Sequence, residues 1–281
     1  MKKCILCESS KNKKIILWKE RSLVKCNKCG LYYVVYRTKK DFINFYNKVY
    51  DKNSNFAKVN ESKKIIFLKI LKKIDCLKGN LLDVGCADGY FLFIAKKFGW
   101  KSYGVEISSA LSNMAKEKYK IDVLNTTLAK AKFNDNYFDA ITLIDVIDQL
   151  ENPVEDLREI IRILKHGGVV VLRLRNSLYH VNVQIFLKKI FGNFVKNMFV
   201  IHEYSFSASK IKEMLARKKF IEIKVNNSPF TGESPYSQFK LSKIFVSYFK
   251  TMLYYIIQVI YFVSFKKLFL SPSLIVYAKK Y

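Results

Sequence analysis

Acidic residues and arginine are both scarce in this chain of 281 residues. The chain contains only 23 Asp and Glu but 50 Lys and Arg, so its formal net charge is +27, and nearly all of the excess is lysine. Such a charge makes nucleic acid, anionic lipid or an anionic substrate a candidate partner. Because arginine forms the better fork for phosphates and base edges, and the lysines are spread over every segment, the charge alone is a weak indication of nucleic-acid recognition.

Low-complexity segments, internal repeats and a leader-like apolar run are missing as well. Hydrophobic residues make up 50% and charged residues 26%, a composition that excludes a disordered or collagen-like protein and suits a globular chain. Residues 1–10 contain an apolar run of two residues, where a secretion signal needs about seven to fifteen. We therefore expect a cytoplasmic protein with reduced cysteines.

Four of the six cysteines form two CxxC pairs, Cys4 with Cys7 and Cys26 with Cys29. Eighteen residues separate the pairs, which is within the range of zinc ribbons, and two such turns can bring four thiolates into tetrahedral geometry. The pattern predicts a closed, structural zinc site; the alternatives are a redox pair or four unliganded buried thiols. A module of about 37 residues with a thin core is expected to need the metal to fold.

Four sections follow one another along the chain. The ribbon, with a short aromatic strand at 31–36, occupies residues 1–37, and apolar residues at every third or fourth position predict a helical connecting arm over 38–78. From 79 to 226 short apolar strands alternate with helices, which indicates a parallel sheet covered on both faces. The expected strands are 81–84, 102–106, 122–125, 138–144, 168–174 and 220–225.

A helical insert is expected at about 178–204, and residues 227–281 form an apolar C-terminal extension with a helix at about 243–269 and a closing strand at 274–278. The helix approaches the length of a membrane span, but polar residues at helical spacing favour packing on the protein or on a membrane surface. Flanking lysines suit an anionic surface. The polar residues are Ser247, Lys250, Thr251, Tyr254, Gln258 and Tyr261.

A glycine-containing turn follows the first strand of the 79–226 section. Gly85 and Gly89 lie in it and a helix begins after it, so backbone is expected to pass close to a ligand there. About twenty residues on, the second strand ends in Glu106, whose carboxylate can bind both hydroxyls of a ribose. Together these residues indicate an adenosine-type ligand at the carboxyl ends of the strands, and the alternative is a turn that only packs a helix on a strand.

The charge of this turn favours one adenosine cofactor over another. NAD places a pyrophosphate on the helix N-terminus, which needs an uncharged approach. Asp83 and Asp88 would repel a pyrophosphate, whereas they would attract the sulfonium and ammonium groups of S-adenosylmethionine.

Residues 76–225 resemble the class I S-adenosylmethionine-dependent methyltransferases. The run 83–89, Asp-Val-Gly-Cys-Ala-Asp-Gly, is similar to the first motif of that family, and 164–168, Leu-Lys-His-Gly-Gly, is similar to its turn before the fifth strand. His202 with the residues after it resembles a His-containing segment ahead of the next helix. One difference is Asp148-Gln149, where many relatives carry Glu-His.

The resemblance implies a doubly wound, Rossmann-like α/β sheet into which the closing strand inserts antiparallel. It also implies a set of cofactor contacts, in which the turn binds the methionine part, Glu106 holds the ribose, the residues after the second and third strands border the adenine, and Asp145 lines the donor pocket. The implied residues are Asp83, Gly85, Cys86, Ala87, Gly89, Glu106, Ile107, Thr127, Leu128 and Asp145.

Methyl transfer from a sulfonium is an in-line displacement in which the protein mainly aligns acceptor and donor. A base is needed when the acceptor is a hydroxyl or a carbon acid. His202 and Asp148 are the main candidates for this base, and His180 is a lesser one. Alternatively, His202 caps or packs a helix and Asp148 is a solvated turn residue.

We therefore predict an S-adenosylmethionine-dependent methyltransferase with a structural zinc ion. By resemblance its acceptor is small or lipid-linked, such as a sugar or a cell-surface or natural-product precursor, and the insert and the extension form the acceptor pocket. A peripheral membrane contact through the C-terminal helix is part of this expectation. Two alternatives remain: methylation of RNA or protein, with the ribbon and lysines holding the polymer, and a non-catalytic adaptor that keeps the fold.

Overall fold

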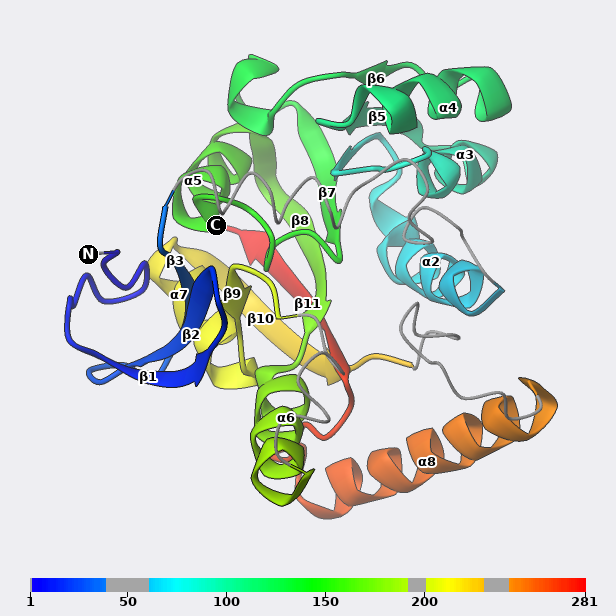
Figure 1. Ribbon diagram of the computed structural model, residues 1–281. Helices are drawn as coiled ribbons and strands as arrows, with labels where there is room; N and C mark the ends of the chain where they lie inside the picture. Colours follow the sequence, from blue (N-terminus) through cyan, green and yellow to red (C-terminus); the bar gives the residue numbers. More distant parts are fainter. Residues whose placement is uncertain (1, 39–60, 192–200, 230–242) are drawn as a thin grey trace.

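The computed structural model of this chain describes residues 2–38, 61–191, 201–229 and 243–281. The arm predicted over 38–78 lies partly outside these residues; inside them it contains α2 (Glu61–Ile74) and the 3-10 helix η2 (Asp75–Leu77). The described strands form two sheets, a four-stranded sheet made mainly by the N-terminal segment and a central seven-stranded sheet (Figure 1).

The central sheet has the strand order β10-β11-β8-β7-β4-β5-β6. Strands β6, β5, β4, β7 and β8 are parallel, and β11 pairs antiparallel with both β8 and β10. The predicted parallel sheet and its antiparallel closing strand are confirmed. The bounds are β4 (Asn80–Val84), β5 (Lys101–Val105), β6 (Val123–Leu124), β7 (Phe138–Ile144), β8 (Leu164–Arg175), β10 (Phe220–Asn227) and β11 (Ser273–Lys280).

Of these strands only β7 matches its predicted range at both ends. β6 has two residues instead of 122–125, and β8 starts at Leu164 instead of 168. Pairing with β7 passes from Leu164 directly to Val169, so the intervening residues form an irregularity inside the strand and not a turn before it. Gly167, at φ +73°, supplies the left-handed conformation that this bulge uses.

Helices cover both faces of the central sheet. Alternate residues of each strand face opposite sides, so Leu81 packs with α2 and α3 (Tyr90–Lys97), whereas Leu82 packs with α5 (Pro153–Ile163) and α7 (Ala208–Arg217). Helix α5 begins where the side chain of Asn152 accepts a hydrogen bond from the backbone N–H of Glu155. Helix α4 (Ser109–Tyr119) packs next to α3, and η3 (Leu128–Lys130) follows β6.

The small sheet combines distant parts of the chain. Its strands are β1 (Asn12–Leu17), β2 (Arg21–Cys26), β3 (Tyr32–Tyr36) and, from far along the sequence, β9 (Tyr204–Ser205), in that order. Tyr33 of β3 pairs with Tyr204 of β9, and both belong to the same buried cluster as Phe206 and Leu215. The ribbon strands therefore pack directly on the segment that precedes α7.

Two further helices lie at the lower edge of the fold in Figure 1: α6 (Ser177–Phe191) and α8 (Lys243–Val263). Helix α8 ends earlier than the predicted 269, because Phe265 and Lys266 have positive φ and the N–H of Lys266 turns back to the carbonyl of Tyr261. Within the described residues, no helix combines the length and hydrophobicity needed to cross a membrane.

Replacing Gly89 with alanine should destabilise the fold more than the same change at Gly167. Both glycines have similar φ, +75° and +73°, so each variant carries about 1–2 kcal/mol of backbone strain. A Cβ at Gly89 would lie 2.8 Å from the Cβ of Ala115 on α4, whereas a Cβ at Gly167 would have no atom within 4 Å. Urea denaturation should therefore show an additional loss of about 1–3 kcal/mol for Gly89→Ala. Equal losses in the two variants would contradict this close packing.

Candidate functional site

The carboxyl ends of β4, β5, β7 and β8 lie along one edge of the central sheet. Parallel pairing sets Val84 beside Val105, and Ile144 beside Arg173, so the segments that follow these strands are neighbours. The direction in which strands are added to the sheet reverses between β4 and β7. Open α/β sheets bind ligands at such a switch point. Most of the site residues predicted from the sequence lie here.

Glu106 connects the turn after β4 to the end of β5. Its carboxylate, in a residue that is 8% exposed, accepts hydrogen bonds from the backbone N–H of Ala87 at 3.0 Å and of Ser108 at 2.8 Å. Burial raises the pKa of Glu106, while these backbone hydrogen bonds lower it. A carboxylate offers about four lone-pair positions, so two remain that could accept from ribose hydroxyls.

Two further carboxylates surround the same turn. Asp83 is buried and accepts a hydrogen bond from Thr142 Oγ1 at 2.5 Å; burial raises the pKa of Asp83 to about 7. Asp88 is buried and accepts from the N–H of Tyr90, at the first turn of α3, and burial raises its pKa as well. Because three acids share one turn, the site favours a cationic ligand over a pyrophosphate, and it fits the sulfonium and ammonium groups of S-adenosylmethionine.

The glycines of this turn are required by packing inside the protein. Gly85 has φ +70°, and a Cβ there would lie 2.7 Å from Cγ2 of Val146 in the loop after β7. A Cβ at Gly89 would meet α4. Ala87 occupies the position where a second glycine is more common, and it also has positive φ. Cys86 is buried in the core, so only its backbone can face a ligand.

The residues after β5 and β6 differ in their access to the edge. Ile107 is 51% exposed and Thr127 is exposed, so both could border an adenine, whereas the side chain of Leu128 is 2% exposed and packs in the core. Sequence reasoning missed Asn125, whose Nδ2 donates to the carbonyls of Glu106 and Ile107 at 2.9 and 3.1 Å. A polar residue at the carboxyl end of a predicted strand was the available signal.

Asp145 is held by an arginine that sequence reasoning missed. Arg173 is 3% exposed; its Nη1 forms an ion pair with Asp145 Oδ1, and its Nε donates to Ser228 Oγ at 3.1 Å. Its Nη2 is buried without a partner among the described residues. An arginine inside the apolar run 168–174 was the signal for a buried cation that needs an acid. The Asp145 side chain remains 28% exposed at the edge.

The structure brings Asp148 and His202 to neighbouring segments, because the N–H of Tyr204 donates to the carbonyl of Asp148 at 3.0 Å. Asp148 is 2% exposed, so the alternative of a solvated turn residue is wrong. The alternative of a helix cap at His202 is wrong as well, since Ser207 caps α7. In the described part of the chain, Asp148 Oδ1 and His202 Nε2 are buried without hydrogen-bond partners.

Burial sets the protonation of these groups. It raises the pKa of Asp148 to about 6, while the charge of Arg175 lowers it. Burial and the charge of Arg175 lower the pKa of His202 well below its usual value, and they lower that of His180 to about 3. Both imidazoles are therefore neutral at pH 7, the form that can accept a proton.

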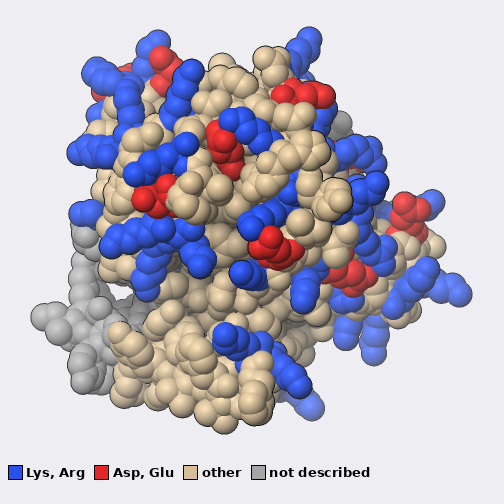
Figure 2. All heavy atoms as spheres, turned by 180° about the vertical axis from the view of Figure 1, so that it is seen from behind, with Lys and Arg blue, Asp and Glu red and all other residues tan. Residues whose placement is uncertain are grey.

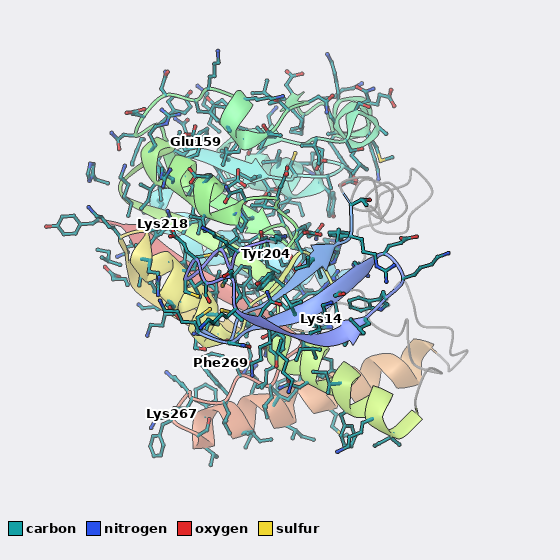
Figure 3. All side chains as sticks on the ribbon, turned by 60° about the vertical axis from the view of Figure 1, so that its left-hand side comes forward. Lys14, Glu159, Tyr204, Lys218, Lys267 and Phe269 are labelled. Atoms are coloured by element: carbon teal, nitrogen blue, oxygen red, sulfur yellow. The ribbon has the colours of Figure 1, made fainter. Side chains whose placement is uncertain are left out.

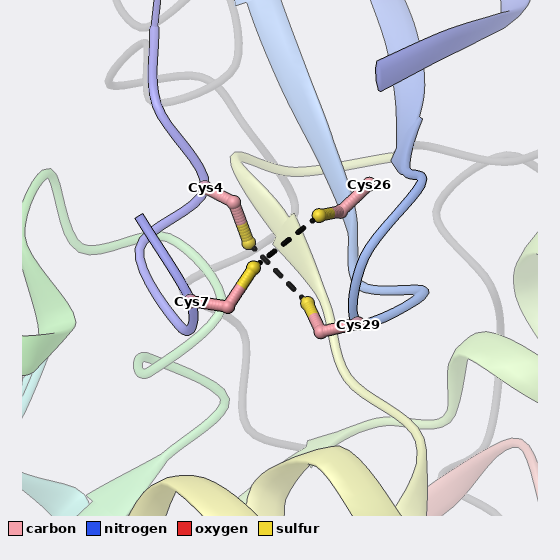
Figure 4. A group of neighbouring side chains, drawn as sticks. All are labelled: Cys4, Cys7, Cys26 and Cys29. Carbon is pink, nitrogen blue, oxygen red and sulfur yellow. Dashed lines mark hydrogen bonds between the residues drawn. The ribbon is translucent and has the colours of Figure 1, made fainter. Parts of the chain in front are cut away.

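The four ribbon cysteines form a compact cluster (Figure 4). Sulfur atoms lie 3.5 Å apart in the pairs Cys4–Cys29 and Cys7–Cys26, and all four lie within 4.8 Å of one another. Tetrahedral zinc with bonds of about 2.3 Å separates its sulfur ligands by about 3.8 Å, so the cluster could hold such an ion. Both of these sulfur–sulfur contacts join one CxxC pair to the other.

Comparisons with known proteins agree with this geometry. Residues 52–220 match the family described as a methyltransferase domain. The chain is 30% identical over 154 residues to an uncharacterized protein of Methanocaldococcus jannaschii, covering 54% of this chain and 70% of that protein. It is 26% identical over 200 residues to a ubiquinone biosynthesis O-methyltransferase of Rickettsia typhi, covering 66% and 79%.

A solved structure has a similar fold. It is the crystal structure of a SAM-dependent methyltransferase, a possible histamine N-methyltransferase, from Thermotoga maritima, with a TM-score of 0.52 and 18% identity, covering 85% of this chain and 96% of that one. At this identity the match supports the Rossmann-like methyltransferase fold.

Asp83→Asn should stabilise the protein toward neutral pH and weaken S-adenosylmethionine binding. The folded pKa of about 7 lies above the usual 3.8, so the native state holds the extra proton and loses stability as pH rises between these values. The advantage of the variant over wild type should therefore grow by roughly 3–4 kcal/mol from about pH 4 to about pH 8. Thr142 can still donate to the amide oxygen. Urea denaturation and calorimetric cofactor titration measure the two effects.

The exposed Asp122, after α4, is the matched control, and Asp122→Asn should change neither quantity. If Asp83→Asn and wild type showed the same dependence of stability on pH, Asp83 would not be the buried acid that titrates in this range.

Proposed function

We propose that this chain, which belongs to the methyltransferase domain family and is an S-adenosylmethionine-dependent methyltransferase, methylates a small or lipid-linked acceptor. The observation that carries the cofactor assignment is the turn after β4, where Asp83, Asp88 and Glu106 surround backbone of positive φ. The Rickettsia relative is named for ubiquinone biosynthesis, which supports a small, lipid-like acceptor. A sugar or a cell-surface or natural-product precursor remains within this proposal.

Each part of the edge has a role in this proposal. The backbone of 85–89 and the carboxylate of Asp83 bind the methionine part, Glu106 holds the ribose, and Ile107 and Thr127 border the adenine. Asp145, fixed by its ion pair with Arg173, lies beside the methyl donor. S-adenosylmethionine supplies a methyl group that the sulfonium already activates, so alignment of the acceptor is the main task of the protein.

The acceptor side requires a group that removes a proton when a hydroxyl or carbon acid is methylated. His202 is the preferred base because its Nε2 is buried without a partner in the described structure and its segment lies beside the loop after β7. Asp148 on the neighbouring segment is the second candidate. With S-adenosylmethionine bound, the attacking atom of the acceptor would bond to the methyl carbon as the sulfur–methyl bond breaks, and S-adenosylhomocysteine would leave. The proton of the acceptor would pass to His202 or to Asp148.

A structural zinc ion on the four ribbon cysteines is also proposed. Its support is the close packing of the four sulfur atoms, two of them in buried residues, Cys4 and Cys26. Because all four tetrahedral positions would be filled by thiolates, this ion would stabilise the ribbon and take no part in methyl transfer.

RNA or protein methylation is the second candidate function. It is favoured by basic and aromatic side chains paired on the ribbon surface, where Arg21 lies over the ring of Trp18 at 4.7 Å and Lys25 over that of Tyr32 at 5.4 Å. Tight RNA binding that falls steeply with salt would support it. A non-catalytic adaptor would instead fail to bind S-adenosylmethionine.

His202→Ala should lower turnover by more than tenfold while leaving S-adenosylmethionine affinity unchanged, because the cofactor contacts lie on other segments. Turnover is measured as S-adenosylhomocysteine release with lipid and small-molecule extracts as acceptor sources, and affinity by calorimetry. His166→Ala is the matched control, since His166 is exposed and its ring Nδ1 is hydrogen-bonded to the backbone oxygen of Tyr281. A loss smaller than tenfold would exclude His202 as the base, and absent cofactor binding would refute the enzymatic proposal.

A peripheral contact with an anionic membrane is proposed for α8. Near the end of this helix the covered side carries Ile257 and Tyr261, each 6% exposed, and the Tyr261 hydroxyl donates to the carbonyl of Val225 at 3.3 Å. The opposite side is apolar and uncovered there, with Val259 62%, Phe262 63% and Val263 73% exposed. Figure 2 shows a broad surface over α8 with few charged side chains.

The lysines near α8 favour an anionic membrane surface as the partner. Lys266 and Lys267 follow the last residue of the helix, Val263, after two intervening residues, and Figure 3 places Lys267 beside the end of the helix. In the sequence no acidic residue follows Glu233. An apolar helical face next to lysines binds the boundary between headgroups and acyl chains, more strongly when the lipids are anionic.

The double variant Val259→Glu, Phe262→Glu should abolish co-sedimentation with acidic liposomes at low salt, because two charges would enter the acyl boundary. Neutral liposomes should bind wild type weakly. Leu17→Glu, an apolar-to-acid change at a 58% exposed position on the ribbon, should have no effect. Absence of wild-type binding to acidic liposomes would exclude the lipid contact. A variant-sensitive dimer in sedimentation velocity would assign the face to a second copy of the chain instead.

A further inference from the structure

We infer that the ribbon positions His202, the proposed base on the acceptor side of the site. Through its pairing with β9 the ribbon holds residues 201–205 against the loop after β7. This inference rests on the proposed function, because it concerns the same acceptor site. It gives a reason for a cysteine cluster in a chain whose cofactor residues lie on other segments.

Backbone hydrogen bonds hold the segment from both sides. Tyr33 of β3 pairs with Tyr204, and the N–H of Val34 donates to the carbonyl of Glu203 at 2.8 Å. On the opposite side the N–H of Tyr204 donates to the carbonyl of Asp148 at 3.0 Å. Figure 3 places Tyr204 beside the ribbon strands. The segment that carries His202 therefore leads directly into β9 of the ribbon sheet and lies beside the loop after β7.

Ribbon side chains fix the residues on both sides of His202. Arg21 donates from Nη1 to the carbonyl of Ile201 at 3.0 Å. Lys2 forms an ion pair with Glu203 at 3.2 Å, and its ammonium lies 4.7 Å from the ring centre of Tyr204. Since the residues immediately before and after His202 are held by the ribbon, the backbone that carries the imidazole keeps its position while the ribbon keeps its structure.

The apolar contacts extend this coupling to the insert. Leu23 and Val34 of the ribbon form one buried cluster with Ile201 and with Val181 of α6. Loss of the ribbon structure would expose all four side chains, so the cost of separation includes apolar burial as well as hydrogen bonds. The ribbon and the acceptor side are expected to open together.

The cysteine cluster connects this coupling to a metal ion. Cys26 ends β2, and its N–H donates to the carbonyl of Leu31, directly before β3. A metal ion on Cys26 and Cys29 would fix this turn and with it the strand that pairs with β9. By contrast, Asp83 and Glu106 accept hydrogen bonds from residues of the main sheet and its loops. Metal removal should therefore affect the acceptor side before the cofactor side.

Arg21 also contributes charge at His202. Burial, the charge of Arg175 and the charge of Arg21 lower the pKa of His202, in that order. Arg21 is thus a positioning residue that also acts electrostatically on the imidazole. Because lysine keeps the positive charge, Arg21→Lys should preserve this electrostatic effect, whereas Arg21→Ala should remove it.

The full-length, zinc-loaded protein provides the test, after metal analysis has established about one zinc per chain. Amide hydrogen exchange of residues 202–206 is compared before and after chelation, and in Arg21→Ala and Arg21→Lys. We expect chelation and Arg21→Ala to raise this exchange at least tenfold, with S-adenosylmethionine affinity changed less than twofold. Arg21→Ala should also raise the pKa of the His202 imidazole in NMR titration, and Arg21→Lys should largely restore the wild-type pKa. Arg158→Ala, at a 67% exposed arginine on α5, is the control.

The outcomes separate this inference from the proposed function. Unchanged exchange in 202–206 after chelation, with cofactor binding intact, would overturn the inference. So would an unchanged imidazole pKa in Arg21→Ala. If chelation unfolded the whole chain, the Arg21 variants would decide, because they leave the cysteines in place. Failure of the untreated protein to bind S-adenosylmethionine would refute the proposed function, while the exchange measurement would still test the coupling.

Discussion

The carboxylate of Glu106 is the constraint on which the cofactor side of this protein depends. It accepts the N–H of Ala87 from the turn after β4 and that of Ser108 before α4, so the turn, the end of β5 and the start of α4 keep one arrangement. Without this carboxylate two N–H groups would lose their partner, and the left-handed conformation of Ala87 would lose its support. The cost is an acid buried beside another acid, Asp83.

The burial of several acids at one turn explains how a strongly basic chain can form a cation-binding site. The formal charge of +27 is carried mostly by lysines. On the face that Figure 2 displays, Lys and Arg side chains are spread over the surface outside the region over α8. At the turn, burial brings Asp83, Asp88 and Glu106 together and raises the pKa of each. A sulfonium and an ammonium group would offset this local repulsion. Net charge therefore describes the surface of the molecule and not its site.

The acceptor side is built differently, from elements that the sequence places far apart. Strand β9 lies between the ribbon and the loop after β7, so His202 depends on contacts from the N-terminal segment and from the middle of the chain. Arg173 forms an ion pair with Asp145, and Arg173 is itself buried. Removing one partner of such a pair leaves an uncompensated charge, which ties the geometry of the edge to the packing of β8.

Helix α8 shows how tertiary packing decides which face of an amphipathic helix is covered. The spacing of its polar residues predicts a polar stripe, but not the surface against which that stripe lies. Tyr261 packs inward and its hydroxyl donates to the carbonyl of Val225, while Val259 and Phe262 face outward. Spacing identifies the two faces of a helix, but only the surface it packs against decides which face is covered.

The sequence by itself determined the alternation of strands and helices over 79–226, the turn at Gly85 and Gly89, the acid at the end of β5 and the pairing of the cysteines. These features are local: hydrophobic period, glycine position and ligand spacing are written in consecutive residues. Only the tertiary structure decided that Arg173 holds Asp145, that Asp148 is buried, and that β9 completes the ribbon sheet. Those contacts join residues that are distant in the chain, and their energy comes from burial that no local pattern specifies.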